Sequence, residues 1–238
     1  MSNITQHGGD EAEFAKPLYT PIKRRSFFMY AGATAGATAL LLSGCDDDSD
    51  NGQPGTVNVG SGDTGVLNYA YALEQLEAAF YTTLRTGTYY TGLQAGSAEK
   101  SALDDLYYHE VIHREFFKAA LGSGAIKGLE PDFSAINFNS RDSVLGAAKT
   151  FEDLGVAAYN GAGKYISDSN YLTLAGKIVS VEARHAALIR DLIQNGSFID
   201  STVVDNDAKE KSLEPSAVVS AANAYLKEGS KLNVSDIK

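Results

Sequence analysis

Apolar residues recur at steps of three and four along four long stretches of the chain, the period of helices that bury one face. These stretches predict helices over about 65–85, 97–122, 140–166 and 171–195. Asp63 or Thr64 is suited to cap the first helix and Ser140 the third, while Gly196 stands where the fourth should end. A shorter helix is expected over 215–226, and no stretch alternates like a strand. The pattern therefore predicts an all-α domain.

Charged residues lie in the middle of two of these apolar seams. The seam of the second predicted helix consists of Leu103, Leu106, Glu110, His113, Phe117 and Ala120. The seam of the fourth consists of Leu174, Ile178, Val181, His185, Leu188 and Leu192, with Glu182 beside His185. An unpaired charge on a buried face is strongly destabilising. Two Glu-x-x-His pairs on core faces therefore indicate a shared metal, since a bound cation would neutralise the negative charge of the buried carboxylates.

The first and third predicted helices resemble each other in the same way. Glu74 and Glu152 each lie at the centre of a seam, and each is followed two helical turns later by a tyrosine, Tyr81 or Tyr159. Each half of the domain thus has a helix with a central Glu followed by a helix with Glu-x-x-His. The pattern predicts a helical hairpin that is used twice.

One Glu from each of two helices and Glu-x-x-His from each of two others is the ligand arrangement of ferritin-like di-metal carboxylate bundles. Residues from about 64 to 228 resemble bacterial ferritin-like domain proteins, including the desiccation-related group. The resemblance rests on four segments in order: Leu73–Tyr81, Glu110-x-x-His113, Glu152–Tyr159 and Val181–His185. It implies a ferritin-like four-helix bundle with a short C-terminal helix.

The resemblance also implies a dinuclear centre of two iron or manganese ions, because carboxylate and imidazole ligands suit both metals. The implied ligands are Glu74, Glu110, His113, Glu152, Glu182 and His185. Glu77 lies in the same seam as Glu74, but its counterpart in the repeat is Gly155, so Glu77 is either a partner of the ligands or an additional ligand. Tyr81 and Tyr159 either hydrogen-bond to ligands or simply pack in the core.

Such a centre implies oxidation by, or removal of, dioxygen or peroxide, with a protective role in stress. One alternative is a non-catalytic structural or interaction module of the cell envelope with a relic metal site. A second alternative is a zinc protease, because residues 109–113 read His-Glu-x-x-His, with Glu110 as the base. The protease interpretation leaves Glu74, Glu152 and the pair Glu182 and His185 unexplained.

Composition narrows the choice of partners and metals. The net charge of −10 and the pI near 4.8 argue against nucleic acid as a partner. Cys45 is the single cysteine, so neither an intramolecular disulfide nor a cysteine-based metal site can form. The histidines are His7, His109, His113 and His185, and three of them lie in or beside the Glu-x-x-His pairs.

The N-terminal region has the order of an export signal: basic residues, then an apolar run from 29 to 44. Arg24 and Arg25 resemble the twin-arginine signal of bacteria. Leu42–Cys45 resembles a lipoprotein lipobox, which would make Cys45 the lipidated residue; the alternative is an uncleaved membrane helix. Asp46–Asp48 resembles the signal that retains lipoproteins at the periplasmic face of the inner membrane.

We therefore expect four segments. They are a signal peptide at 1–44, a flexible tether at 45–62, a four-helix bundle at 63–195 and an extension with a short helix at 196–238. The tether prediction rests on a run of Asp, Ser, Gly and Asn.

Overall fold

The computed structural model describes residues 55–238. The predicted export and lipidation residues Arg24, Arg25 and Cys45, and the first part of the predicted tether, lie outside the described residues. Within the described part of the chain, none of the helices has the length and hydropathy needed to cross a membrane.

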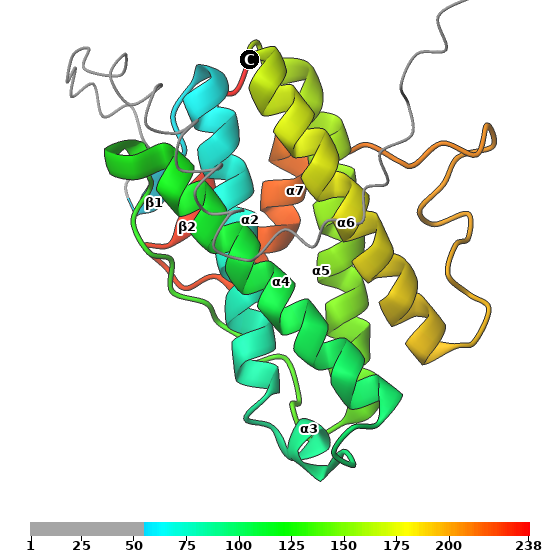
Figure 1. Cartoon of the computed structure of the whole chain (residues 1–238). Helices are drawn as coiled ribbons and strands as arrows, with labels where there is room; N and C mark the ends of the chain where they lie inside the picture. Colours follow the sequence, from blue (N-terminus) through cyan, green and yellow to red (C-terminus); the bar gives the residue numbers. More distant parts are fainter. Residues whose placement is uncertain (1–54) are drawn as a thin grey trace, which may run out of the picture. The chain divides into compact units, whose positions relative to one another are not determined.

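Four long helices form the body of the domain (Figure 1). They are α2 (Gly62–Leu84), α4 (Ala98–Leu121), α5 (Arg141–Ala162) and α6 (Ser169–Ile193). The main packing partner of α2 is α4, and that of α5 is α6, so two helical hairpins lie against each other. The predicted all-α bundle is confirmed. One short helix between α2 and α4 was not predicted, α3 (Thr88–Gly92).

Side-chain caps begin three of the four long helices. Ser140 Oγ accepts a hydrogen bond from the Ser143 N–H, as predicted for this position. Ser97 and Asp168 cap α4 and α6 in the same manner. Because each cap satisfies a backbone donor that the helix itself leaves unpaired, these residues set where the helices start.

The predicted caps of the first helix, Asp63 and Thr64, are wrong, because α2 begins earlier, after Ser61. The Asp63 carboxylate instead accepts hydrogen bonds from the backbone N–H groups of Ser167 and Asp168, at 2.7 and 2.9 Å. Asp63 therefore joins the start of α2 to the start of α6, a contact between residues about a hundred positions apart that helix periodicity does not reveal.

The ends of the chain add a small sheet and a short helix. Strands β1 (Thr56–Asn58) and β2 (Lys231–Asn233) pair in parallel, with Val57 opposite Leu232. The expected flexible tether is therefore wrong for its last residues, because Val57 and Val59 are buried in the core. Strands of three residues are too short to show alternation, which explains why the sequence did not reveal them.

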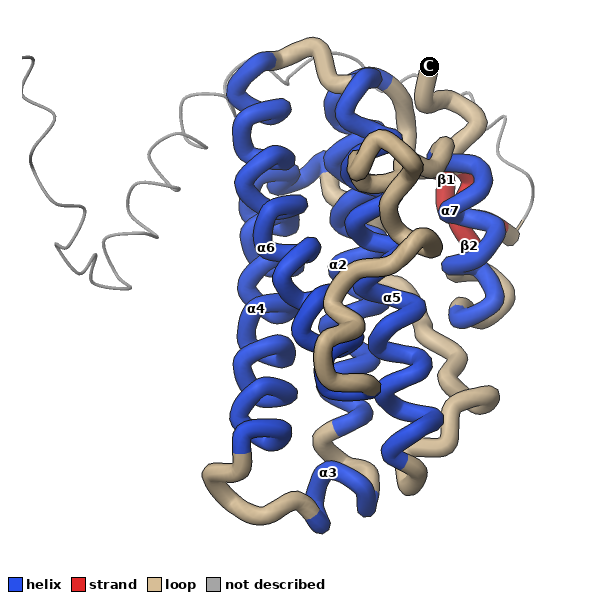
Figure 2. Tube along the Cα trace, turned by 90° about the vertical axis from the view of Figure 1, so that its right-hand side faces the viewer, coloured by secondary structure: helices blue, strands red, loops and turns tan. Residues whose placement is uncertain are grey.

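The predicted C-terminal helix is confirmed as α7 (Pro215–Ala222), which continues into the 3₁₀ turn η3 (Asn223–Tyr225). It packs against α5, on the side of the bundle away from α4 and α6 (Figure 2). The third predicted helix also ends in such a turn, η2 (Gly163–Tyr165), after α5; a further turn, η1 (Gly122–Gly124), follows α4.

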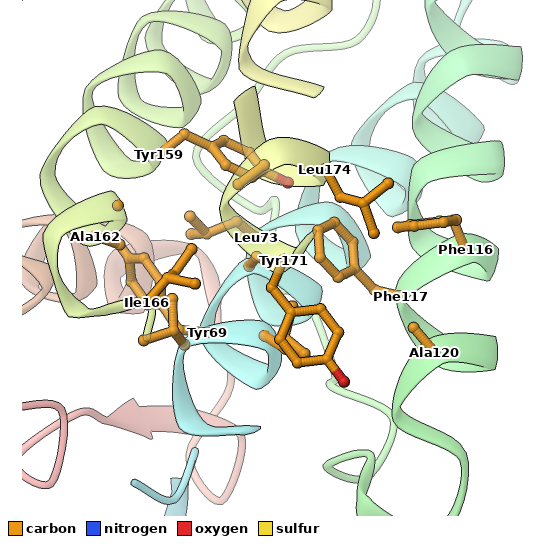
Figure 3. Close-up of a pocket in the computed structure, with 15 residues that line it drawn as sticks. Tyr69, Leu73, Phe116, Phe117, Ala120, Tyr159, Ala162, Ile166, Tyr171 and Leu174 are labelled. Atoms are coloured by element: carbon orange, nitrogen blue, oxygen red, sulfur yellow. The ribbon is translucent and has the colours of Figure 1, made fainter. Parts of the chain in front are cut away.

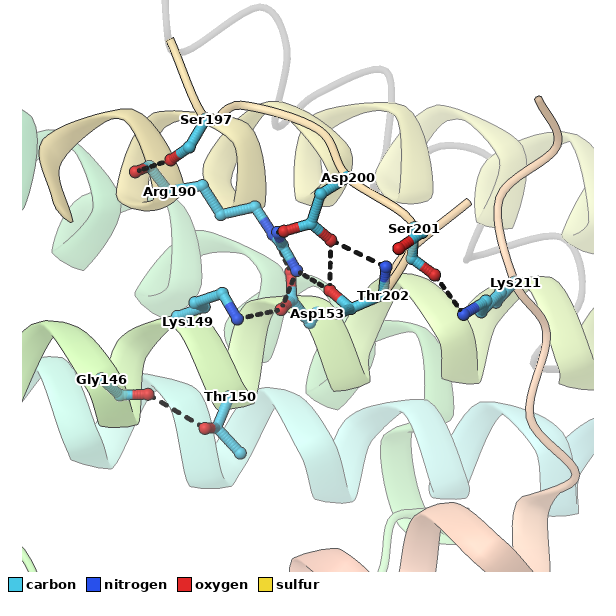
Figure 4. A network of polar contacts seen from close by, with 10 residues as sticks. All are labelled: Gly146, Lys149, Thr150, Asp153, Arg190, Ser197, Asp200, Ser201, Thr202 and Lys211. Carbon is cyan, nitrogen blue, oxygen red and sulfur yellow. Dashed lines mark hydrogen bonds and ion pairs between the residues drawn. The ribbon is translucent and has the colours of Figure 1, made fainter. Parts of the chain in front are cut away.

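A polar network fastens the segment between α6 and α7 to the bundle (Figure 4). Arg190 is 2% exposed, and its guanidinium donates to both oxygens of Asp153, to Asp200 and to Thr202, at 2.7–2.8 Å. Further along, the Leu213 N–H donates to a carbonyl of α5. Gly161 permits this approach, because a Cβ there would lie 1.8 Å from the Leu213 carbonyl oxygen.

Candidate metal centre

All six predicted ligands converge between the four long helices. Glu74 comes from α2, Glu110 and His113 from α4, Glu152 from α5, and Glu182 and His185 from α6. The four carboxylates are 0% exposed and His185 is 4% exposed. Buried carboxylates at this density are rare unless they are paired or bind a cation.

The six residues form two groups that overlap. One group contains Glu74, Glu110, His113 and Glu182, and the other contains Glu110, Glu152, Glu182 and His185. Within each group the candidate ligand atoms lie within 4.8 Å of one another. Glu110 and Glu182 belong to both groups, so the two groups that could each hold a metal ion share two carboxylates.

The two groups are related by the repeat of the hairpin. His113 Nδ1 lies 2.8 Å from Glu182 Oε1 and 3.4 Å from Glu74 Oε2. His185 Nδ1 lies 2.8 Å from Glu110 Oε1 and 3.4 Å from Glu152 Oε2. Each histidine therefore approaches the shared carboxylate that belongs to the other Glu-x-x-His pair.

The atoms that face this centre fit metal ions better than they fit one another. Although each Nδ1 lies 2.8 Å from a glutamate oxygen, none of these buried atoms makes a hydrogen bond of acceptable geometry to a described residue: Glu74 Oε2, both oxygens of Glu110 and Glu182, Glu152 Oε2, and Nδ1 of His113 and His185. Such atoms nearly always have a partner in folded proteins. Since they all point into one space, and oxygen and imidazole donors suit iron and manganese, the donor set fits a dinuclear centre of either metal.

Burial and mutual repulsion determine which of these groups hold protons when no cation neutralises them. Burial raises the pKa of Glu110 to about 8, and it also raises the pKa values of Glu74 and Glu152. Burial lowers the pKa of His113, but Glu110, Glu182 and Glu74 outweigh it and raise that pKa to about 12. Burial opposes ionisation of Glu182 too, yet the two imidazoles lower its pKa to about 2. The metal-free centre therefore stores protons that cations would displace.

Two tyrosines connect the halves of the centre crosswise. The Tyr81 hydroxyl of α2 donates to Glu152 Oε1 of α5 at 2.5 Å, and the Tyr159 hydroxyl of α5 donates to Glu74 Oε1 of α2. Of the two roles considered from the sequence, the structure has these tyrosines hydrogen-bonded to candidate ligands. Each bond occupies one carboxylate oxygen and leaves the other facing the centre.

A family model described as "Ferritin-like domain" matches residues 62–195, the span from α2 to α6 that contains every candidate ligand. The chain belongs to the ferritin-like domain family. A comparison with curated protein sequences found no match.

Glu77 lies beside the centre of this ferritin-like bundle but in neither group of candidate ligands. It is 3% exposed and faces Gly155, where a Cβ would lie 3.0 Å from Glu77 Oε1. Gly155 thus makes room for Glu77, which explains why the repeat has glycine at this position. Burial and the neighbouring carboxylates raise the pKa of Glu77 well above its ordinary value, which favours its protonated form in the metal-free protein.

The zinc-protease interpretation of residues 109–113 is wrong for this ferritin-like site. That motif needs His109 and His113 to bind one ion, with Glu110 as the base. In the structure Glu110 lies among the candidate ligands, whereas His109 is in neither group and its Nδ1 lies 2.8 Å from His185 Nε2. The ligand set predicted from the sequence did not include His109. Its position directly before Glu110 was the one sequence feature that placed it near the centre.

A small apolar cavity lies next to the centre, between α2, α4, α5 and α6 (Figure 3). Its lining includes Leu73, Phe117, Tyr159, Ile166 and Leu174. Leu73 directly precedes Glu74, and Phe117 lies one helical turn after His113. Tyr159, whose hydroxyl donates to Glu74, is thus also part of the cavity wall.

Proposed function

We propose that this ferritin-like domain binds two iron or manganese ions and oxidises a substrate with, or removes, dioxygen or peroxide. Glu74, Glu110, His113 and Glu182 would hold one ion, and Glu110, Glu152, Glu182 and His185 would hold the other. The observation that carries the proposal is the sharing of Glu110 and Glu182 by both ligand groups. Bound there, the pair of ions would supply the redox chemistry that protein side chains lack.

Charge balance supports two ions rather than one. The four ionised carboxylates of the centre would balance two divalent cations when both imidazoles are neutral. A neutral centre reduces the free-energy cost of burying these charges. A single divalent ion would neutralise only half of the negative charge. The tyrosines would hold Glu74 and Glu152 in orientation while the centre exchanges its protons for cations.

The cavity beside Tyr159 supports the proposal that one reactant is small and apolar. Apolar cavities stay dry and take up small apolar molecules, and dioxygen is such a molecule. The walls of this cavity are apolar side chains from all four long helices. The buried position of the ligands would keep bulk water away from the reacting atoms.

We further propose that the domain acts outside the cytoplasm, anchored through Cys45 to the periplasmic face of the inner membrane, in protection against oxidative or drying stress. This part is supported by the resemblance of residues 24–25 and 42–48 to export, lipidation and retention signals. It also follows the likeness to the desiccation-related group.

Elemental analysis of protein purified from its native envelope tests the proposal. We expect about two metal ions per chain by charge balance, and consumption of dioxygen or peroxide by the loaded protein. Metal-free protein whose melting temperature does not change on adding Fe(II) or Mn(II) would instead indicate a non-catalytic envelope module.

A further inference from the structure

His109 contacts the centre from outside it. Its Nδ1 lies 2.8 Å from Nε2 of His185, and the two ring planes are 23° from parallel with their centroids 5.1 Å apart, so the rings meet edge to edge. The other ring nitrogen of His185, Nδ1, faces Glu110 and Glu152. One ring nitrogen of His185 therefore faces the centre, and the other contacts an exposed side chain of α4.

This contact has one consistent assignment of protons when His185 binds a cation. A neutral imidazole that offers the Nδ1 lone pair to a metal carries its proton on Nε2. The Nε2–H of His185 then donates to Nδ1 of His109. Partners of this kind fix the tautomer and the ring orientation of a metal ligand, and their removal typically weakens metal binding about 10–100-fold.

Within residues 55–238, the other histidine of the centre, His113, has no equivalent partner. The residue that precedes Glu182, at the position corresponding to His109 in the repeat, is Val181, which cannot accept a hydrogen bond. Among the described residues, no side chain or backbone group hydrogen-bonds to Nε2 of His113. The repeat is thus broken at this one contact, although it is kept in the tyrosine bonds.

We propose that His109 is a positioning residue that holds His185 in the tautomer that binds metal through Nδ1, and that the two metal sites are therefore unequal. The site of Glu152 and His185 binds its ion more tightly than the site of Glu74 and His113. The inference rests on the proposed function, since it needs a dinuclear centre. It adds that the site of Glu152 and His185 binds its ion before the site of Glu74 and His113 does.

Two variants at one position separate the hydrogen bond from packing. His109→Val copies the residue that the repeat has at 181 and removes the acceptor. His109→Asn keeps an acceptor, because the side-chain oxygen of Asn can take the place of Nδ1. Tyr108→Phe, a neighbour on the same exposed part of α4, serves as the matched control.

The experiment is a calorimetric titration of metal-free full-length protein with Mn(II). It is combined with ring nitrogen NMR of the Zn(II)-loaded protein, which reports the tautomer of His185. We expect two affinities in the wild type and a protected Nε2–H on His185. In His109→Val, the tight site should weaken about 10–100-fold, the second site should keep its affinity, and the protected proton should be lost. His109→Asn should restore most of the affinity, and Tyr108→Phe should match the wild type.

The outcomes distinguish this inference from the proposed function. If the wild type binds two ions and His109→Val binds both as tightly, the inference is overturned while the dinuclear centre stands. Equal weakening by His109→Val and His109→Asn also overturns it, because the hydrogen bond is then not the cause. If the wild type binds no metal, the proposed function fails, and the inference fails with it.

Discussion

Candidate ligands of the centre are held by contacts that lie outside it. Tyr81 donates a hydrogen bond to Glu152, and Tyr159 donates one to Glu74. In each pair, the tyrosine and the glutamate belong to different hairpins. Such crosswise bonds orient a carboxylate from the opposite side of the bundle. The positions of the ligand atoms therefore depend on the packing of the two hairpins and not only on the helix that carries each ligand.

The shared carboxylates should matter more for metal content than the unshared ones. Glu182→Gln should remove both ions, because Glu182 belongs to both ligand groups, whereas Glu74→Gln should remove one. The exposed residue Glu115 provides the control, as Glu115→Gln. Metal per chain after dialysis is the measurement. A Glu182→Gln protein that retains both ions would contradict the assignment.

Gly155 and Glu77 should be energetically coupled. A Cβ at 155 would lie 3.0 Å from Glu77 Oε1, so Gly155→Ala should destabilise the protein by about 1–3 kcal/mol through overpacking. In a Glu77→Ala background the same change should stabilise it by up to about 1 kcal/mol, because alanine favours helix and the space is free. Urea unfolding of the four metal-free proteins measures both effects. Equal effects in the two backgrounds would show that the contact does not exist.

The sequence could reveal the six residues of the centre because they combine local spacing with a repeat. Glu110 and His113 lie on one helix face, and the second hairpin repeats the pattern. The role of His109 could not be predicted in this way, because its partner is 76 positions away and side-chain contacts between helices are not periodic.

At the scale of elements, helix periodicity predicted the four long helices to within a few residues. It could do so because each helix buries one continuous stripe along its length. Strands β1 and β2 depend instead on pairing between the two ends of the described chain, and Asp63 depends on a loop that lies beside it only after folding. Contacts of this kind require the tertiary structure.

The segment from 196 to 213 should be held in place by Arg190. Arg190→Met would leave Asp153 and Asp200 without their partner and so weaken the attachment of this segment to α5 and α6. We expect faster proteolysis within this segment and unchanged metal content. Arg184→Met, on the exposed side of α6, is the control. Cleavage at the wild-type rate would rule out this role of the network.

At the scale of the whole molecule, the centre links stability to pH. Glu110 ionises near 4.5 when unfolded but near pH 8 in the folded metal-free protein, so its stabilising contribution is lost as pH rises through this range. The contribution of His113 has the same sign, since it is complete below about 6.5 and is lost toward pH 12. Glu182 acts in the opposite direction, but its contribution is complete above about 4.5.

The metal-free protein should therefore melt at a lower temperature at pH 9 than at pH 6. Metal binding displaces the stored protons, so added Mn(II) should raise the melting temperature more at pH 9 than at pH 6. Calorimetry at several pH values, with and without metal, provides the comparison. A metal-dependent increase that shrinks with rising pH would mean that the centre holds no displaceable protons.

The most direct test of the account is the anomalous X-ray scattering of a crystal of the Mn(II)-loaded protein. We predict two peaks per chain, about 3.5–4 Å apart as in other two-metal sites, with Glu110 and Glu182 contacting both. One peak would contain Glu74 and His113 in its surroundings, and the other Glu152 and His185. A single peak, or no peak between these four helices, would contradict the central claim.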